Sequence, residues 1–183
     1  SDGTYTPVTV QLTTTDTPVE RTSLNVTKVW TDVPTGTSTP AVIVTLYRNG
    51  DKTAHTLTLD STNSYQGSFS NLAVTDNFGK DYTYTVQETV PDGYTSSQTT
   101  TGDTVTITNT YQYGQITLTK VGSDDANAGL AGATFELRQA DGTVVDTQTT
   151  GTDGTATFTK VAQGTYTLVE TQAPTGYQLA KSQ

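Results

Sequence analysis

Hydrophobic and polar residues alternate along most of this chain with a period of two, which is typical of half-buried β-strands. In residues 24–30 the alternation places Leu24, Val26, Lys28 and Trp30 on one face. Lys28 is therefore predicted to point into an apolar layer. An ammonium group in such a layer tends to find a charged partner or to lose its proton.

Two later strands each aim one polar side chain inward. Residues 82–88 place Glu88 on the apolar face, and residues 105–111 place Asn109 there. One interpretation is a buried Lys/Glu ion pair with a hydrogen-bonded Asn, or a lysine that reaches the strand end. The other interpretation is that the three side chains react. Burial disfavours the charges of both Lys28 and Glu88, so the pair can exist as a neutral amine beside a carboxylic acid. Glu88 could then assist the attack of Lys28 on the Asn109 carboxamide, which would form an isopeptide bond.

The pattern restarts near residue 114, which indicates an internal repeat. Lys120 takes the place of Lys28, and Glu170 takes the place of Glu88. The spacing predicts two tandem all-β domains, over residues 21–112 and 113–183. Ordinary β-sandwich repeats do not require an inward Lys and Glu at matched positions, so the repetition favours the chemical interpretation.

Residues 5–15 also alternate, so residues 1–20 are predicted to hold the last strand of a preceding domain. At the spacing of the first domain, an acceptor for Glu170 would lie beyond residue 183, and the second domain lacks its final strand. We therefore expect residues 5–16 of one chain to complete the second domain of a neighbouring chain, head to tail. Asp16 would then serve as the acceptor for a second isopeptide bond, from Lys120. The alternative is a frayed second domain with a disordered N-terminal segment.

Composition supports an all-β protein and excludes several functions. About a quarter of the residues are threonine, which favours solvent-facing strand positions. The net charge of −9 argues against nucleic acid and membrane partners. The absence of cysteine excludes disulfides and thiol chemistry. We expect no cofactor and no metal, since the acidic loop at residues 123–127 does not have EF-hand spacing. No catalytic motif indicates an enzyme that acts on another molecule.

Four motifs, Val26-Thr-Lys-Val-Trp30, Tyr84-Thr-Val-Gln-Glu88, Pro91-Asp-Gly-Tyr94 and Ile107-Thr-Asn-Thr-Tyr111, resemble those of Cna B-type domains of Gram-positive surface proteins. The motif Leu130-Ala-Gly-Ala-Thr-Phe-Glu-Leu137, together with the segment from Glu170 to Tyr177, resembles the related SpaA-type pilin domain. The resemblance implies two inverse-immunoglobulin, transthyretin-like β-sandwich domains.

The resemblance also implies a self-formed bond between Lys28 and Asn109, promoted by Glu88. In the second domain only Lys120 and Glu170 match the pattern. The function implied is an extracellular stalk or spacer, in a pilus or an adhesin anchored to the cell wall, next to further domains of the same kind. The alternative is a ligand-binding adhesin module that contacts a host matrix protein or another surface protein. Tyr111 and Tyr113 would be candidate contact residues in that case.

Overall fold

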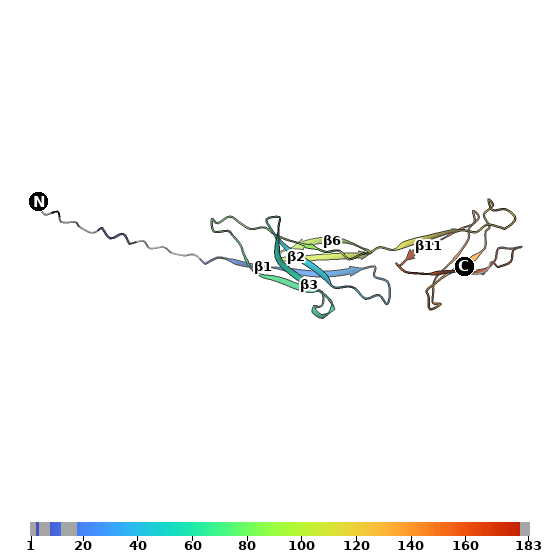
Figure 1. Ribbon diagram of the computed structural model, residues 1–183, viewed down its shortest axis with the longest axis horizontal. Coiled ribbons are helices and arrows are strands. Elements are labelled where there is room, and N and C mark those ends of the chain that lie inside the picture. The colour runs from blue at the N-terminus through green and yellow to red at the C-terminus, as the bar shows by residue number, and fades with distance from the viewer. Residues whose placement is uncertain (1–2, 4–7, 12–17, 180–183) are drawn as a thin grey trace.

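The chain is seen here in a computed structural model, which describes residues 3, 8–11 and 18–179. Twelve β-strands and one short 3-10 turn, at Ser61–Asn63, make up its regular structure in that part of the chain. The strands form two groups that follow one another along the long axis of the molecule (Figure 1). The predicted all-β architecture with two tandem domains is therefore confirmed.

The first domain is a sandwich of two sheets. One sheet has the order β4 (Gln66–Ala73), β1 (Arg21–Thr31), β7 (Thr104–Tyr111) and β6 (Tyr94–Thr101); the other has β3 (Asp51–Leu59), β2 (Val42–Arg48) and β5 (Tyr84–Glu88). β1 and β7 run parallel, whereas all other neighbours in both sheets are antiparallel. Alternate residues of both sheets fill the space between them, because successive side chains on a strand point to opposite faces. The buried apolar core consists of Leu24, Val26, Val42, Val44, Leu46, Leu59, Phe69, Leu72, Val86, Val105 and Ile107.

Turn residues set the register of the β2–β3 hairpin. Asn49 and Gly50 connect the two strands with φ values of 53° and 87°. Positive φ at both central residues is the requirement of a type I′ turn, which Asn-Gly satisfies at little cost. The hairpin then places Val42 and Val44 opposite Leu59 and Leu57.

The second domain repeats this plan with fewer strands. β8 (Gly114–Thr119) pairs with β11 (Thr155–Val161), and β9 (Thr134–Arg138) lies between β10 (Val144–Thr149) and β12 (Thr167–Gln172). Its smaller core contains Ala133, Phe135, Leu137, Phe158 and Val161. Among the described residues, β8 has a partner on one side only.

Only Gln112 and Tyr113 separate the last strand of the first domain from the first strand of the second. The backbone N–H of Gln163, in the second domain, donates a hydrogen bond to the Tyr111 hydroxyl at 2.9 Å. The Tyr111 ring packs edge-on against Tyr94 and Tyr113, with centroid distances of 5.2 and 5.0 Å. Tyr111 therefore belongs to the junction between the domains, where its ring and its hydroxyl are both engaged.

Two segments differ from the strands expected from sequence. β6 was not predicted, because an exposed edge strand of Ser, Gln and Thr carries no apolar alternation. Residues 8–11 lie in the predicted N-terminal strand but have no strand pairing, and Val8 and Val10 are 87% and 82% exposed. A strand is stable only beside another strand, and these residues pair with none of the described strands. The rest of that predicted strand, with Asp16, lies outside the described residues.

Candidate functional site

Three strands bring Lys28, Glu88 and Asn109 together inside the first domain. In the parallel β1–β7 pair, Lys28 lies opposite Ile107, and Trp30 lies opposite Asn109. Lys28 and Asn109 are thus diagonal neighbours on the inward face of one sheet. Glu88 ends β5 in the facing sheet and reaches them from the other side of the core.

The amine and the carboxamide meet at the same carboxylate oxygen. Lys28 Nζ lies 3.6 Å from Glu88 Oε1, and Asn109 Nδ2 donates a hydrogen bond to that oxygen at 3.0 Å. The side chains of Lys28 and Glu88 are 0% and 2% exposed, and Asn109 is fully buried. Glu88 is therefore in place to exchange a proton with either neighbour.

Burial changes the charge state of the lysine. Desolvation lowers the pKa of the Lys28 ammonium from 10.5 to about 8, and the charge and hydrogen bond of Glu88 limit the drop. Lys28 Nζ also donates to the Val29 carbonyl at 3.1 Å and to the Ile107 carbonyl at 3.4 Å, and it lies 4.3 Å from the centre of the Trp30 ring. At a pKa of about 8, roughly a tenth of the amines are neutral at pH 7, which is a usable fraction of nucleophile.

The carbonyl oxygen of the Asn109 carboxamide, Oδ1, is buried without a hydrogen-bond partner. A buried acceptor left in this state costs about 1–3 kcal/mol. A half-turn of the carboxamide would bring Oδ1 toward Glu88, which could donate to it when the carboxyl is protonated. That orientation polarises the carbonyl and makes its carbon a better electrophile.

Ser96 is a part of the site that sequence reasoning missed. Its hydroxyl donates to Glu88 Oε2 at 3.0 Å, so both carboxylate oxygens are engaged. Ser96 lies opposite Asn109 in the β6–β7 pair, a relation that no local pattern in β6 indicates. A cavity of about 300 Å³ borders Glu88 between β5 and β6 and offers a route to solvent for a proton or a small leaving group.

The arrangement can form an amide bond without a cofactor. Neutral Lys28 Nζ attacks Asn109 Cγ to form a C–N bond, and the C–Nδ2 bond breaks. Glu88 takes one proton from the incoming amine and passes one to Nδ2, so that ammonia leaves. All the atoms required belong to these three side chains.

The second domain holds a related pair in a more open setting. Lys120 Nζ lies 3.0 Å from Glu170 Oε1 and donates a hydrogen bond to Oε2 at 3.1 Å. The two side chains are 16% and 3% exposed. Because Asp16 lies outside the described residues, its bond to Lys120 stays a prediction.

The other candidate features have structural roles. In the acidic loop, Asp125 accepts a hydrogen bond from the backbone of Asn127, and Asp124 accepts from the Tyr177 hydroxyl. In the described part of the chain, no group of His, Asp or Glu could hold a metal ion. A helix with the length and apolar character to cross a membrane is likewise not found there.

Comparison with known proteins identifies relatives of both domains. Residues 24–110 match the Cna protein B-type domain, and residues 114–183 match the SpaA prealbumin-like fold domain. A solved single B repeat unit of the collagen binding surface protein Cna of Staphylococcus aureus is 30% identical. That match covers 87% of this chain and 90% of the repeat, with a TM-score of 0.43. The search of curated proteins gave no match.

The Bacillus anthracis TIE protein is 25% identical, with a TM-score of 0.64 over 88% of this chain. A structure of two B repeats of Cna is 23% identical, with a TM-score of 0.47 over 84% of this chain. The chain spans 30% of the length of the TIE protein and 45% of the two-repeat structure.

Proposed function

This chain belongs to the family of Cna B-type and SpaA prealbumin-like domains, and from that premise we propose that it is a structural stalk module. The stalk is part of a pilus or a wall-anchored adhesin on the surface of a Gram-positive bacterium. Its first domain is stabilised by a self-formed isopeptide bond between Lys28 and Asn109. Further domains of the same kind are its neighbours along the stalk. The only catalysis in this proposal is the single self-modifying turnover that forms the bond.

The observation that carries the proposal is the meeting of Lys28 Nζ and Asn109 Nδ2 at one oxygen of Glu88. A structural ion pair explains the lysine and the glutamate but not the buried Asn109 Oδ1 that lacks a partner. Bond formation removes that cost, because it releases Nδ2 as ammonia and lets the new amide carbonyl accept a hydrogen bond from the protonated Glu88 carboxyl group. The lowered pKa of Lys28 supports the same conclusion, since it supplies the neutral amine.

The position of the bond suits a stalk under tension. β1 and β7 are the first and last strands of the first domain and lie side by side in one sheet. A force applied at the two ends of the domain acts on these two strands. A covalent link between them carries that force through bonded atoms, so the sheet between the ends is not peeled apart.

Intact mass spectrometry tests the bond. The purified chain is expected to be lighter than its sequence mass by one ammonia, and a protease digest should contain a branched peptide that joins the segments around Lys28 and Asn109. Lys28→Ala and Asn109→Ala chains should have their full sequence masses. A folded parent chain of unmodified mass would contradict the proposal.

The role of Glu88 needs a matched control in the second domain. Glu88→Gln keeps the size of the side chain but removes the proton exchange, so we expect it to prevent or greatly slow the loss of ammonia. Glu170→Gln makes the same change in the related pair and should leave the loss unchanged. Normal bond formation in Glu88→Gln would refute the proton-transfer role of Glu88.

A further inference from the structure

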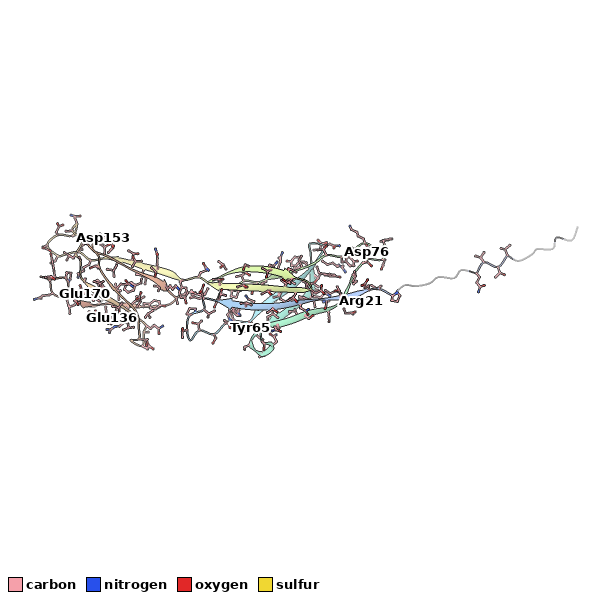
Figure 2. The ribbon with its side chains drawn as sticks, turned by 180° about the vertical axis from the view of Figure 1, so that it is seen from behind. Arg21, Tyr65, Asp76, Glu136, Asp153 and Glu170 are labelled. Atoms are coloured by element: carbon pink, nitrogen blue, oxygen red, sulfur yellow. The ribbon has the colours of Figure 1, made fainter. Side chains whose placement is uncertain are left out.

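A second pocket of the first domain lies at the end of the sandwich where β1 begins. Its volume is about 280 Å³, close to the lower limit for small-molecule sites, and strands β1 to β5 all contribute to its lining. Leu46 and Leu72 are its most buried lining residues, and Tyr84 beside them is half-buried. Figure 2 shows Arg21, which also lines the pocket, at this end of the molecule. The pocket shares no residue with the site of the isopeptide bond.

The side chains around this pocket are unusually basic for the chain. Arg21 and Arg48 are two of its three arginines, and His55 is its single histidine. The whole chain carries 18 Asp and Glu residues against 9 Lys and Arg residues. The pocket is therefore a locally positive surface on an acidic protein, an arrangement that attracts an anion.

Neither arginine of the pocket is neutralised within the part of the chain that the structure describes. The third arginine, Arg138, forms an ion pair with Glu136, whereas no ion pair of the described residues includes Arg21 or Arg48. Asp51 lies opposite Arg48 in the β2–β3 hairpin, but the two side chains do not form an ion pair. Both guanidinium groups thus keep their charge available for a ligand.

Both guanidinium groups are also held in place. The Arg48 guanidinium lies 4.7 Å from the centre of the Tyr82 ring, a cation–π contact that restrains its position. Arg21 Nη1 donates a hydrogen bond to the Asn71 carbonyl at 3.2 Å. Side chains that are restrained before a ligand arrives lose less entropy when it binds. The pocket is therefore preorganised for an anion.

A bulge in β4 places the Asn71 carbonyl beside Arg21. In the β1–β4 pair, the two steps from Thr22 to Leu24 correspond to the three steps from Leu72 to Phe69. Asn71 lies in this bulge with a φ of 59°, which is uncommon for a residue other than glycine. Bulges of this kind redirect groups of a strand and are frequent next to functional sites. The irregular backbone at the rim supports a role in binding.

The charge and the size of the pocket select a small ligand with one carboxylate. A guanidinium group matches a carboxylate through two parallel N–H···O bonds. A polyanion is disfavoured, because the net charge of −9 repels additional negative charge at longer range. The volume of about 280 Å³ suits a ligand of one ring.

The remaining polar groups favour a sugar acid over an acidic amino-acid side chain. The Asn71 carboxamide and the His55 imidazole belong to lining residues whose hydrogen bonds, among the described residues, are made by the backbone. The hydroxyl groups of a sugar ring can donate to and accept from such side chains. The side chain of Asp or Glu has only methylene groups next to its carboxylate and would leave them unused.

We propose that this pocket binds a hexuronic acid unit of a glycan. Arg21 and Arg48 bind its carboxylate, and Asn71 and His55 bind its hydroxyl groups. The site is independent of the isopeptide bond and gives the stalk module a ligand of its own.

An NMR titration of the full chain with glucuronate tests the site. Backbone amide shifts around the pocket should saturate with a Kd on the order of 1 mM, as is typical of a ligand with about a dozen non-hydrogen atoms. Glucose has the same ring without the carboxylate, and propionate resembles a glutamate side chain without the ring. Each should bind at least about tenfold more weakly than glucuronate, since each lacks part of the hydrogen bonding.

Variants of the pocket residues identify the groups that bind. Arg21→Gln and Arg48→Gln each remove one charge and should weaken glucuronate binding by about tenfold or more. Lys160→Gln removes a positive charge from an exposed position on β11 of the second domain and is the matched control, with an unchanged Kd. Asn71→Gly covers the case in which an arginine variant unfolds, because glycine adopts the positive φ and only the carboxamide is lost. It should weaken binding by about threefold or more.

Three outcomes would overturn the proposal. The first is the absence of saturable shifts around the pocket at glucuronate concentrations up to about 50 mM, far above the expected Kd. The second is an equal loss of affinity in Arg48→Gln and Lys160→Gln, which would indicate an effect of net charge alone. The third is equal affinity for glucuronate and for glucose or propionate. Equal affinity for propionate would replace the sugar acid with an acidic side chain of a protein.

Discussion

The two domains of this chain carry the same inward Lys and Glu in different surroundings. In the first domain β7 covers the edge of β1, and the Lys28 side chain is 0% exposed. In the second domain the corresponding edge of β8 is open within the described residues, and the Lys120 side chain is 16% exposed. The identity of the residue pair is therefore not what decides its chemistry. The strand beside the lysine removes it from water and also supplies the carboxamide.

The first domain shows how strongly the neighbouring strand β7 affects the charge state of the lysine. Desolvation lowers the pKa of Lys28 to about 8 although Glu88 lies close enough to oppose the shift. In the second domain Lys120 makes two close contacts with Glu170, at 3.0 and 3.1 Å. The first arrangement favours a neutral nucleophile, whereas the second is a partly exposed ion pair. The following predictions test this difference, in order of decreasing effect.

Removal of the proposed cross-link should have the largest effect. Lys28→Ala opens a covalent loop of about 80 residues, which is worth roughly 4–5 kcal/mol of unfolding free energy in the loop-entropy description. For a domain of this size that corresponds to a fall in melting temperature of roughly 20 °C. Calorimetry and limited proteolysis measure it. Lys120→Ala is the control and should leave the transition of the first domain unchanged.

The lowered pKa of Lys28 should make the stability of a bond-free first domain rise with pH. In Asn109→Ala the lysine stays unbonded, with a pKa of about 8 in the folded state and 10.5 in the unfolded state. The unfolded state then binds more protons between these values, so unfolding free energy should increase by roughly 2 kcal/mol from about pH 7 to 9.5. Below about pH 7 Lys28 is protonated in both states, so this contribution is constant.

Denaturant titrations at several pH values measure this dependence, with Lys28→Met as the bond-free control that lacks the titrating group. Measurements should stay below the range in which tyrosines ionise, because burial raises the pKa of Tyr94 and its titration would act in the opposite direction. Parallel curves for Asn109→Ala and Lys28→Met would show that Lys28 is not the source of the effect.

Disruption of the ion pair in the second domain should have a smaller effect. The Lys120–Glu170 pair is neither fully buried nor exposed, so Lys120→Met is expected to cost about 1–2 kcal/mol, between the values for surface and buried pairs. Hydrogen exchange in the second domain measures this change in its unfolding free energy. Lys160→Met alters an exposed lysine on β11 of the same domain and should have almost no effect. A cost equal to that of a fully buried pair would contradict the partial exposure of the Lys120 side chain.

The smallest effect is expected at the junction. Tyr111→Phe removes the hydroxyl that accepts from Gln163 but keeps the ring contacts with Tyr94 and Tyr113, at a cost of about 1 kcal/mol. The two domains should then reorient more freely, which NMR relaxation and small-angle X-ray scattering detect. Tyr113→Phe is the control, because no hydrogen bond of the Tyr113 hydroxyl is found within the described residues. Equal behaviour of the two variants would show that the hydrogen bond does not fix the junction.

Local alternation was enough to predict much of this protein. It predicted the strands that carry Lys28, Glu88 and Asn109 and the inward direction of all three side chains. The Asn49-Gly50 turn and the repeat of the first domain in the second could be found in the same way. These features are properties of a few neighbouring residues, since the face of a strand on which a residue lies depends only on the period of two.

Only the tertiary structure decided which strands lie beside each other. The parallel register of β1 and β7 brings Lys28 and Asn109 to one oxygen of Glu88, and β6 adds the hydroxyl of Ser96 from a strand without any apolar pattern. The pKa of Lys28 and the open edge of β8 also follow from these contacts. Strand pairing depends on residues far apart in sequence, and burial is a property of the assembled core, so neither can be read from a local period.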